Sequence, residues 1–344
     1  AFQTLMPRFD IYRTLSQTSN SIKELSVFNP LTIHRKGTKA KAVFALALVC
    51  ILWGTTWVAS KLGVKYMPSL QMAGIRQTLG GLCYVIFFLA KGARFPARKE
   101  WGSIVVLSLL NFALTNGLST WGLKHITAGL GAIMGAIFPL WLVVIGLFSG
   151  SKTPARAIIG LLIGFAGICI IFYEHLQDFF NPDFRFGILI SLVATWTWAF
   201  GTLYTKRKAA SFNPYFSLGL QMLISGIILL VFTQLVNTPE TKSAVPFTAI
   251  PWQSWAAVAY LVIFGSVLSF IAYLYALQHL PTEQASIYAY INPIVAVLLG
   301  WLLFAESISV FIIIGGLVTL AGVYMVNKAF KALPAVEQPE AEGV

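Results

Sequence analysis

The sequence has few charged residues. Lysine, arginine, aspartate and glutamate together make up 10% of its 344 residues, and only 12 residues are acidic. A soluble domain contains about 25% charged residues. Hydrophobic residues make up 57% of the chain, and its mean hydropathy is +0.77. This composition excludes an ordinary soluble domain and indicates a protein embedded in lipid.

The sequence is also poor in patterns that support catalysis or metal binding. Its 3 cysteines, Cys50, Cys83 and Cys169, lie in apolar runs without the spacing of metal ligands, and we interpret them as core residues. A phosphate-binding glycine loop, an HExxH motif and a nucleophile elbow are all missing. A lipid-modifying membrane enzyme would need clustered His, Asp or Glu, which the sequence also lacks. We therefore predict no enzymatic activity, no cofactor and no metal.

Long apolar stretches dominate the chain instead. A bilayer core needs about 20 apolar residues per helix, and ten stretches meet this requirement. We expect membrane-spanning helices near residues 42–60, 70–90, 103–123, 127–149, 155–173, 186–205, 214–236, 254–277, 284–304 and 308–327.

The two ends of the chain are polar. Residues 1–40 lack the apolar core of a cleavable signal peptide. We expect them to form a cytoplasmic N-terminal tail, on the charge distribution described next. A disordered segment, an amphipathic surface helix and an organelle-targeting segment remain alternatives for this tail. Residues 329–344 contain prolines and glutamates, and we expect a disordered cytoplasmic tail there.

The basic residues lie between the apolar stretches and are unevenly distributed. If the N-terminus is cytoplasmic, eighteen of the 24 lysines and arginines fall on the cytoplasmic side and five on the other side, with Arg76 inside a span. The positive-inside rule therefore places both termini in the cytoplasm of a cell (inner) membrane protein. The net charge of +12 is explained by this topology, so we do not expect a nucleic-acid partner.

The chain contains an internal duplication. Residues 137–151 align with residues 291–307, with Pro139 opposite Pro293 and Gly146 opposite Gly300. The alignment extends over two five-span units, 41–174 and 185–328. Because each unit has an odd number of spans, the second enters the membrane from the opposite side. We therefore predict an all-α integral membrane fold of ten transmembrane helices, arranged as two inverted five-helix repeats.

Inverted repeats are typical of carriers that work by alternating access. Membrane proteins turn polar side chains away from lipid, so polar and aromatic positions that share a helix face predict a central cavity. We expect the second repeat to contribute more hydroxyls and amides and the first more aromatic and apolar surface. Helix-to-helix hydrogen bonding is the alternative role for these residues. The predicted substrate-binding residues are Trp53, Trp57, Arg76, Asn111, Thr115, Ser119, Trp198, Ser269, Tyr273, Tyr288 and Asn292.

Arg76 is the one charge predicted to lie well inside a span. It could extend to the membrane surface or pair with backbone carbonyls, or it could attract a substrate carboxylate or phosphate. The middle of each predicted span lacks Asp and Glu. A central carboxylate that couples transport to protons is therefore disfavoured.

Four segments resemble EamA-type members of the drug/metabolite transporter superfamily. They are WGTTWVASKLG at 53–63, GIRQTLGG at 74–81, NPIVAVLLGWLLFAES at 292–307 and GGLVTLAGVYMV at 315–326. The resemblance implies two inverted five-helix repeats around a cavity for small metabolites, often amino acids that are exported. The glutamate expected after the fourth span would fall near Ser151, and only the second repeat keeps it, as Glu306.

We therefore expect a transporter that moves a small organic metabolite, an amino acid or related compound, outward by alternating access. A duplicated membrane scaffold or a channel is the alternative. The expected partners are a small-molecule substrate and the lipid bilayer, and a monomer is the expected state.

Overall fold

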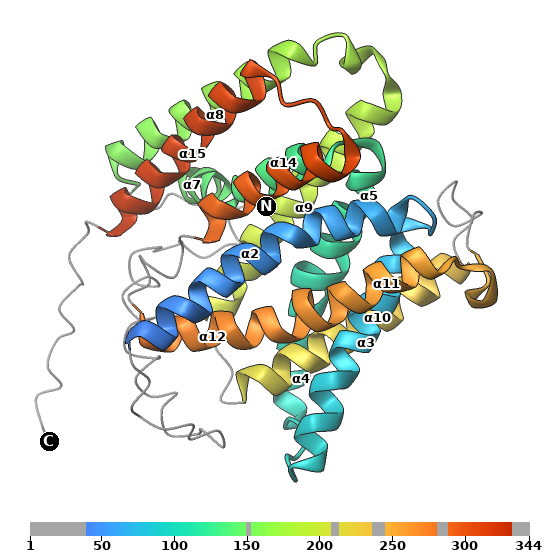
Figure 1. Cartoon of the computed structure of the whole chain (residues 1–344). Coiled ribbons are helices and arrows are strands. Elements are labelled where there is room, and N and C mark those ends of the chain that lie inside the picture. The colour runs from blue at the N-terminus through green and yellow to red at the C-terminus, as the bar shows by residue number, and fades with distance from the viewer. Residues whose placement is uncertain (1–38, 149–152, 208–212, 236–244, 281–287, 332–344) are drawn as a thin grey trace, which may run out of the picture.

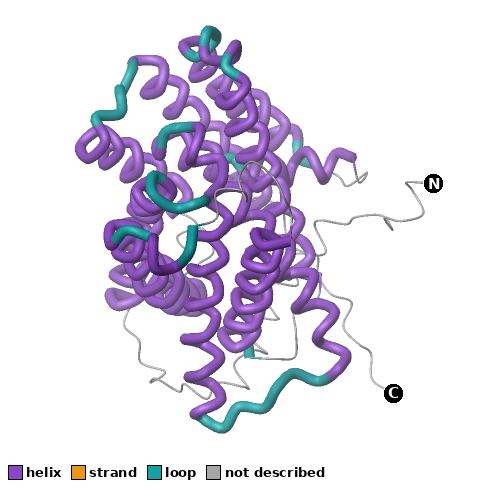
Figure 2. Tube along the Cα trace, turned by 90° about the vertical axis from the view of Figure 1, so that its right-hand side faces the viewer, coloured by secondary structure: helices purple, strands orange, loops and turns teal. Residues whose placement is uncertain are grey.

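The computed structural model describes residues 39–148, 153–207, 213–235, 245–280 and 288–331. These residues form a bundle of helices, and the described part of the chain contains no strand (Figure 1, Figure 2). Six spans are continuous helices: α2 (Lys39–Val64), α3 (Ser69–Ala90), α8 (Ala155–Glu174), α9 (Pro182–Arg207), α10 (Pro214–Leu235) and α15 (Val310–Lys331).

The other spans are shorter or interrupted. The third comprises η2 (Arg98–Glu100), α4 (Trp101–Leu107), the π-helical η3 (Ser108–Leu114) and α5 (Thr115–His125). The fourth comprises α6 (Ala128–Ala136) and α7 (Phe138–Phe148), and the eighth comprises α11 (Trp252–Tyr260), the π-helical η6 (Leu261–Leu268) and α12 (Ser269–His279). The ninth is α14 (Tyr288–Phe304). Short 3-10 turns, η4 (Asp178–Phe180) and η5 (Phe247–Ala249), lie in the connections.

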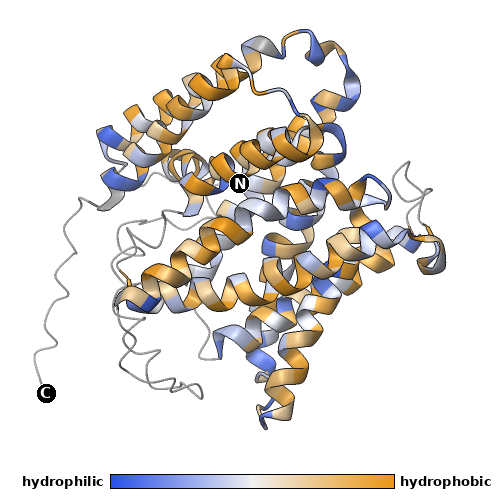
Figure 3. Ribbon diagram, in the orientation of Figure 1, coloured by the Kyte–Doolittle hydropathy of each residue, from blue (hydrophilic) through white to orange (hydrophobic). Residues whose placement is uncertain are grey.

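The described residues confirm the membrane fold. Nine helical stretches are long and apolar enough to cross a bilayer, and the 17-residue α14 is a further apolar helix. Large apolar side chains such as Leu162, Phe165 and Leu302 are exposed on the outer faces of the helices, where hydrophobic residues dominate (Figure 3). In water such a surface would be unfavourable, whereas against lipid it is not.

The predicted tails lie mostly outside the described residues. Helix α2 already begins at Lys39, and α15 continues to Lys331, so both helices extend a few residues into the predicted tails. The predicted start of the ninth span, at residue 284, also falls outside the described part of the chain.

Two helix pairs join the repeats through glycines. Helix α8 lies along α15, and α3 lies along α10 (Figure 1). A Cβ added to Gly167 would overlap the backbone nitrogen of Thr319, and one added to Gly322 would overlap that of Gly164. Only glycine lets the two backbones approach this closely.

These contacts also reveal the symmetry of the fold. The alignment of residues 160–167 with 315–322 pairs Gly167 with Gly322 and Gly164 with Thr319, so each contact is the symmetry mate of the other. The α3–α10 pair repeats this pattern. A Cβ on Gly81 would overlap Leu223, and a Cβ on Gly226 would overlap Thr78; an alignment offset of 145 residues pairs Gly81 with Gly226 and Thr78 with Leu223. Such reciprocal contacts indicate a two-fold relation between the repeats.

The close packing of α8 and α15 makes a testable prediction. We expect Gly322→Ala to destabilise the protein by about 1–3 kcal/mol, because the new methyl group forces the two helices apart. Thermal unfolding in detergent, followed by loss of monodisperse protein, measures the effect. Gly316→Ala is the matched control, since its Cβ would meet only Ile133 at 3.9 Å. Equal melting temperatures for the two variants would contradict the role assigned to the crossing.

Candidate functional site

A central cavity of about 210 Å³ lies between the two repeats. Helices α2, α3, α5, α6 and α7 line it from the first repeat, and α9, η6, α12 and α14 line it from the second. Eight of the eleven predicted residues lie in its wall: Trp53, Trp57, Arg76, Thr115, Ser119, Trp198, Tyr288 and Asn292. Their role in substrate binding stays a prediction.

Aromatic rings form one wall of the cavity. The Trp53 ring centroid lies 5.2 Å from that of Phe270 and 4.9 Å from that of Tyr288. Trp57 lies against Gly131 and Gly135 of α6, where an added Cβ would overlap its ring. The two tryptophans, one helical turn apart on α2, thus present flat apolar surfaces to the cavity.

Three predicted residues do not line the cavity. Asn111 points at Gly201 of α9, where a side chain would overlap its amide. The Ser269 hydroxyl donates to the carbonyl of Phe264 within its own span. Tyr273 lies behind the aromatic wall, with its ring centroid 5.0 Å from that of Trp53 and its hydroxyl hydrogen-bonded to Tyr288.

The π-helical segments explain why Asn111 and Ser269 were predicted wrongly as cavity residues. The prediction assumed α-helical spacing through the third and eighth spans, but each contains a π segment at an equivalent position. A π turn closes from residue i to i+5, so side chains before it and after it no longer share a face at the α-helical spacing. The side-chain amide of Asn116 donates to the carbonyl of Asn111, which lies within the π segment, at 3.0 Å. Asn116 and Phe270 line the cavity in place of Asn111 and Ser269.

Other lining residues were not among the predicted set. Thr56 and Ser60 follow Trp53 at the helical spacing i+3 and i+7 on α2, and Ser191 and Thr195 share the predicted face of α9 with Trp198. The α-helical spacing that selects Trp198 also places Ser191 and Thr195 on its face, and Thr56 and Ser60 could have been found in the same way. The positions of Thr120 and Asn116 in the cavity wall depend on the π segment that precedes them. The first repeat supplies most of the hydroxyls, so the expected polarity of the two repeats was wrong.

The π segment η6 offers backbone groups to neighbouring helices. Trp53 Nε1 donates to the carbonyl of Gly265 at 3.2 Å, and the Tyr84 hydroxyl donates to that of Val267 at 2.9 Å. Arg76 Nε donates to the Ser266 hydroxyl at 3.3 Å. Side chains from α2 and α3 thus donate hydrogen bonds to two carbonyls and one hydroxyl of η6.

Arg76 is half-buried and lines the cavity. Its guanidinium has Ser266 as its hydrogen-bond partner, and no carboxylate of a described residue lies within 4.0 Å of it. Neither predicted structural role, extension to the membrane surface or pairing with backbone carbonyls, matches this arrangement. Asn292 completes the opposite side, where its amide nitrogen, suitably oriented, donates to the carbonyl of Cys50 at 2.9 Å.

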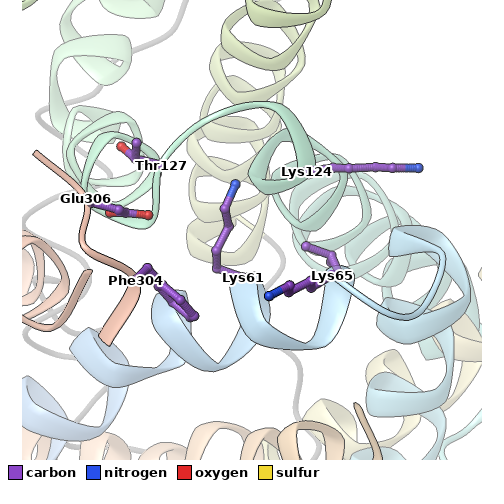
Figure 4. A pocket seen from close by; sticks show the side chains of 7 residues that line it. Lys61, Lys65, Lys124, Thr127, Phe304 and Glu306 are labelled. Carbon is purple, nitrogen blue, oxygen red and sulfur yellow. The ribbon is translucent and has the colours of Figure 1, made fainter. Parts of the chain in front are cut away.

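A second pocket, of about 470 Å³, lies where α2 ends and α6 begins. We call it the Lys61 pocket, lined by Lys61, Val64, Lys65, Lys124, Thr127, Phe304 and Glu306 (Figure 4). Neighbouring residues line the two spaces: Ser60 and Leu123 line the cavity, and Lys61 and Lys124 line the pocket.

Lys61 and Glu306 bind the two sides of the α5–α6 turn. Lys61 Nζ donates to the carbonyls of Leu123 and Ile126, each at 2.6 Å, at the end of α5. Glu306 accepts from the backbone nitrogens of Ala128 at 2.9 Å and Gly129 at 3.4 Å, at the start of α6. A cation at a helix C-terminus and an anion at an N-terminus are both favourable to the helix dipoles.

Removing the Glu306 carboxylate tests this arrangement. We expect Glu306→Ala to destabilise the protein by about 1–2 kcal/mol, because two backbone donors of α6 lose their acceptor. A lower melting temperature in detergent would show the effect. Asp183→Ala, which removes an exposed carboxylate from the first turn of α9, is the control and should change stability little. A loss no larger than that of the control would rule out the capping role.

Comparison with known proteins places this geometry in context. The inner membrane transporter YedA of Escherichia coli strain K12, described as uncharacterized, is 31% identical over 267 residues, covering 77% of this chain and 83% of the relative. The uncharacterized transporter YvbV of Bacillus subtilis is 27% identical over 86% of this chain and 95% of its own length. A chloroplastic WAT1-related protein of Arabidopsis thaliana is 28% identical over 80% of this chain and 66% of its own length.

A solved crystal structure shares the fold. It covers 86% of this chain with all of its own residues, at 17% sequence identity and a TM-score of 0.57. The EamA-like transporter family matches residues 40–173 and 185–328, which is one match for each sequence copy. The chain therefore belongs to the EamA-like transporter family.

Proposed function

We propose that the protein carries a small organic metabolite across a cell membrane by alternating access, with export as its direction. One observation supports this most directly: the central cavity lies between two repeats whose helix contacts are related by an approximate two-fold. In such an arrangement the repeats 41–174 and 185–328 can exchange conformations, which opens the same site to each side in turn.

The distribution of basic residues supports an orientation for this carrier. With both termini cytoplasmic, the Lys61 pocket faces outward and lies between the central cavity and the exterior. Lys61, Glu306 and the α5–α6 turn then form the outer gate, which must separate when the cavity opens outward. Residues 1–40 and 329–344 would lie in the cytoplasm.

Cysteine labelling tests the orientation. In intact cells, with the exposed Cys83 and Cys169 replaced by serine, an impermeant maleimide should label Lys65→Cys and leave Arg94→Cys unlabelled until the cells are permeabilised. Both positions are exposed, so accessibility alone cannot explain a difference. The reverse labelling pattern would refute the proposed orientation.

Transport itself is tested in proteoliposomes that contain the purified protein. A panel of amino acids and related small acids should include at least one compound whose uptake saturates, with and without a pH gradient. Linear uptake that never saturates would indicate a channel, and no uptake of any compound would favour a membrane scaffold.

The aromatic wall should matter for this transport. We expect Trp53→Ala or Tyr288→Ala to lower transport about tenfold or more, because each removes a large contact surface from the cavity. The matched controls are Trp301→Ala and Tyr324→Ala, whose side chains are 55% and 54% exposed on the outside of the bundle. Unchanged uptake by both cavity variants would contradict a role for this wall.

A further inference from the structure

We infer that the central cavity takes a small organic monoanion, a carboxylate with an apolar body, and that Arg76 binds its charged group. This inference rests on the proposed carrier function and narrows its substrate. The inferred substrate differs from an amino acid because it needs no ammonium group.

The described wall of the cavity carries a positive charge. Arg76 is the one ionic side chain among the described residues that line the cavity, and its hydrogen-bond partner is the neutral Ser266 hydroxyl. A cation in a membrane protein is costly unless it is paired. A guanidinium also presents a planar pair of donors that matches a carboxylate. A bound carboxylate would therefore supply the missing partner.

The other described residues of the cavity wall disfavour a zwitterionic substrate. An amino acid also brings an ammonium group, which binds best to a carboxylate. The described lining of the cavity contains no Asp or Glu, and its polar groups are hydroxyls and amides such as Ser119, Asn116 and Asn292. The Trp53 and Tyr288 rings instead offer contact area to an apolar body. The single positive charge of Arg76 likewise balances a monoanion better than a phosphate dianion.

The Lys61 pocket also carries a net positive charge. Lys61, Lys65 and Lys124 line it, and its single carboxylate, Glu306, already accepts two backbone N–H groups of α6. Figure 4 shows Lys61 directed at the α5–α6 turn and Lys124 extending away from Glu306 at the rim. An excess of positive charge beside the cavity lowers the energy of an anion along this path.

Three compounds with one aromatic body test the inference: 3-phenylpropanoate, phenylalanine and phenethylamine. They carry an anion, a zwitterion and a cation. Binding to the detergent-solubilised protein is followed by intrinsic tryptophan fluorescence, since Trp53, Trp57 and Trp198 line the cavity. Uptake into proteoliposomes is measured in parallel, with the leak into protein-free liposomes subtracted.

We expect 3-phenylpropanoate to bind at least tenfold more tightly than the other two compounds. Arg76→Gln should weaken its binding about ten- to a hundredfold, as expected for the loss of a hydrogen-bonded charge. Arg76→Lys should retain part of the affinity, because it keeps the charge without the planar donors. Arg185→Gln, which removes an exposed positive charge from α9, is the control and should bind like the wild type.

The outcomes separate the two proposals. Equal or tighter binding of phenylalanine or phenethylamine by the wild type overturns the anion inference and leaves the carrier proposal standing, even if Arg76→Gln does not fold. Unchanged binding of the anion by Arg76→Gln overturns the role of Arg76. Selective, Arg76-dependent binding of the anion without any uptake supports the anion site and contradicts the carrier proposal.

Discussion

The structure depends on one constraint, the need to satisfy every backbone N–H and C=O group away from water. Within lipid this requirement leaves helices as the form of each span. The departures from α-helical bonding, η3 and η6, therefore lie where other helices can reach them. Trp53 and Tyr84 bind carbonyls of η6, and Arg76 binds its Ser266 hydroxyl. The same breaks that cost regular hydrogen bonds thus position an aromatic ring and a cation at the cavity.

Close helix crossings join the two repeats. Gly167 and Gly322 bring α8 against α15, and Gly81 and Gly226 bring α3 against α10, so each crossing joins one repeat to the other. The cavity lies between the same two repeats. The backbone arrangement is nearly symmetric, whereas the side chains are not. Arg76 in α3 corresponds to the neutral Gln221 in α10, so the repeats present different chemistry to a shared space.

Much of the site could be predicted from helical spacing. Trp53 and Trp57 on α2 and Trp198 on α9 lie in uninterrupted α-helices, where the α-helical period holds and the predicted face was the cavity face. Asn111 and Ser269 were misplaced because a π turn has no reliable signature in the residues that form it. Tyr273 was predicted to line the cavity but packs behind Trp53 and Tyr288. A sequence does not distinguish an aromatic residue in the cavity wall from one that packs behind the wall.

The sequence by itself determined the membrane class, the ten spans and the duplication, because these follow from residue composition and repetition along one dimension. The tertiary structure decided which polar residues meet. It directed Arg76 into the cavity without a described carboxylate beside it, and it tied Glu306 to the start of α6, 178 residues away in the sequence from Ala128. Such pairings depend on helix rotation and on distances across the bundle, and neither quantity is recorded in the order of residues along the chain.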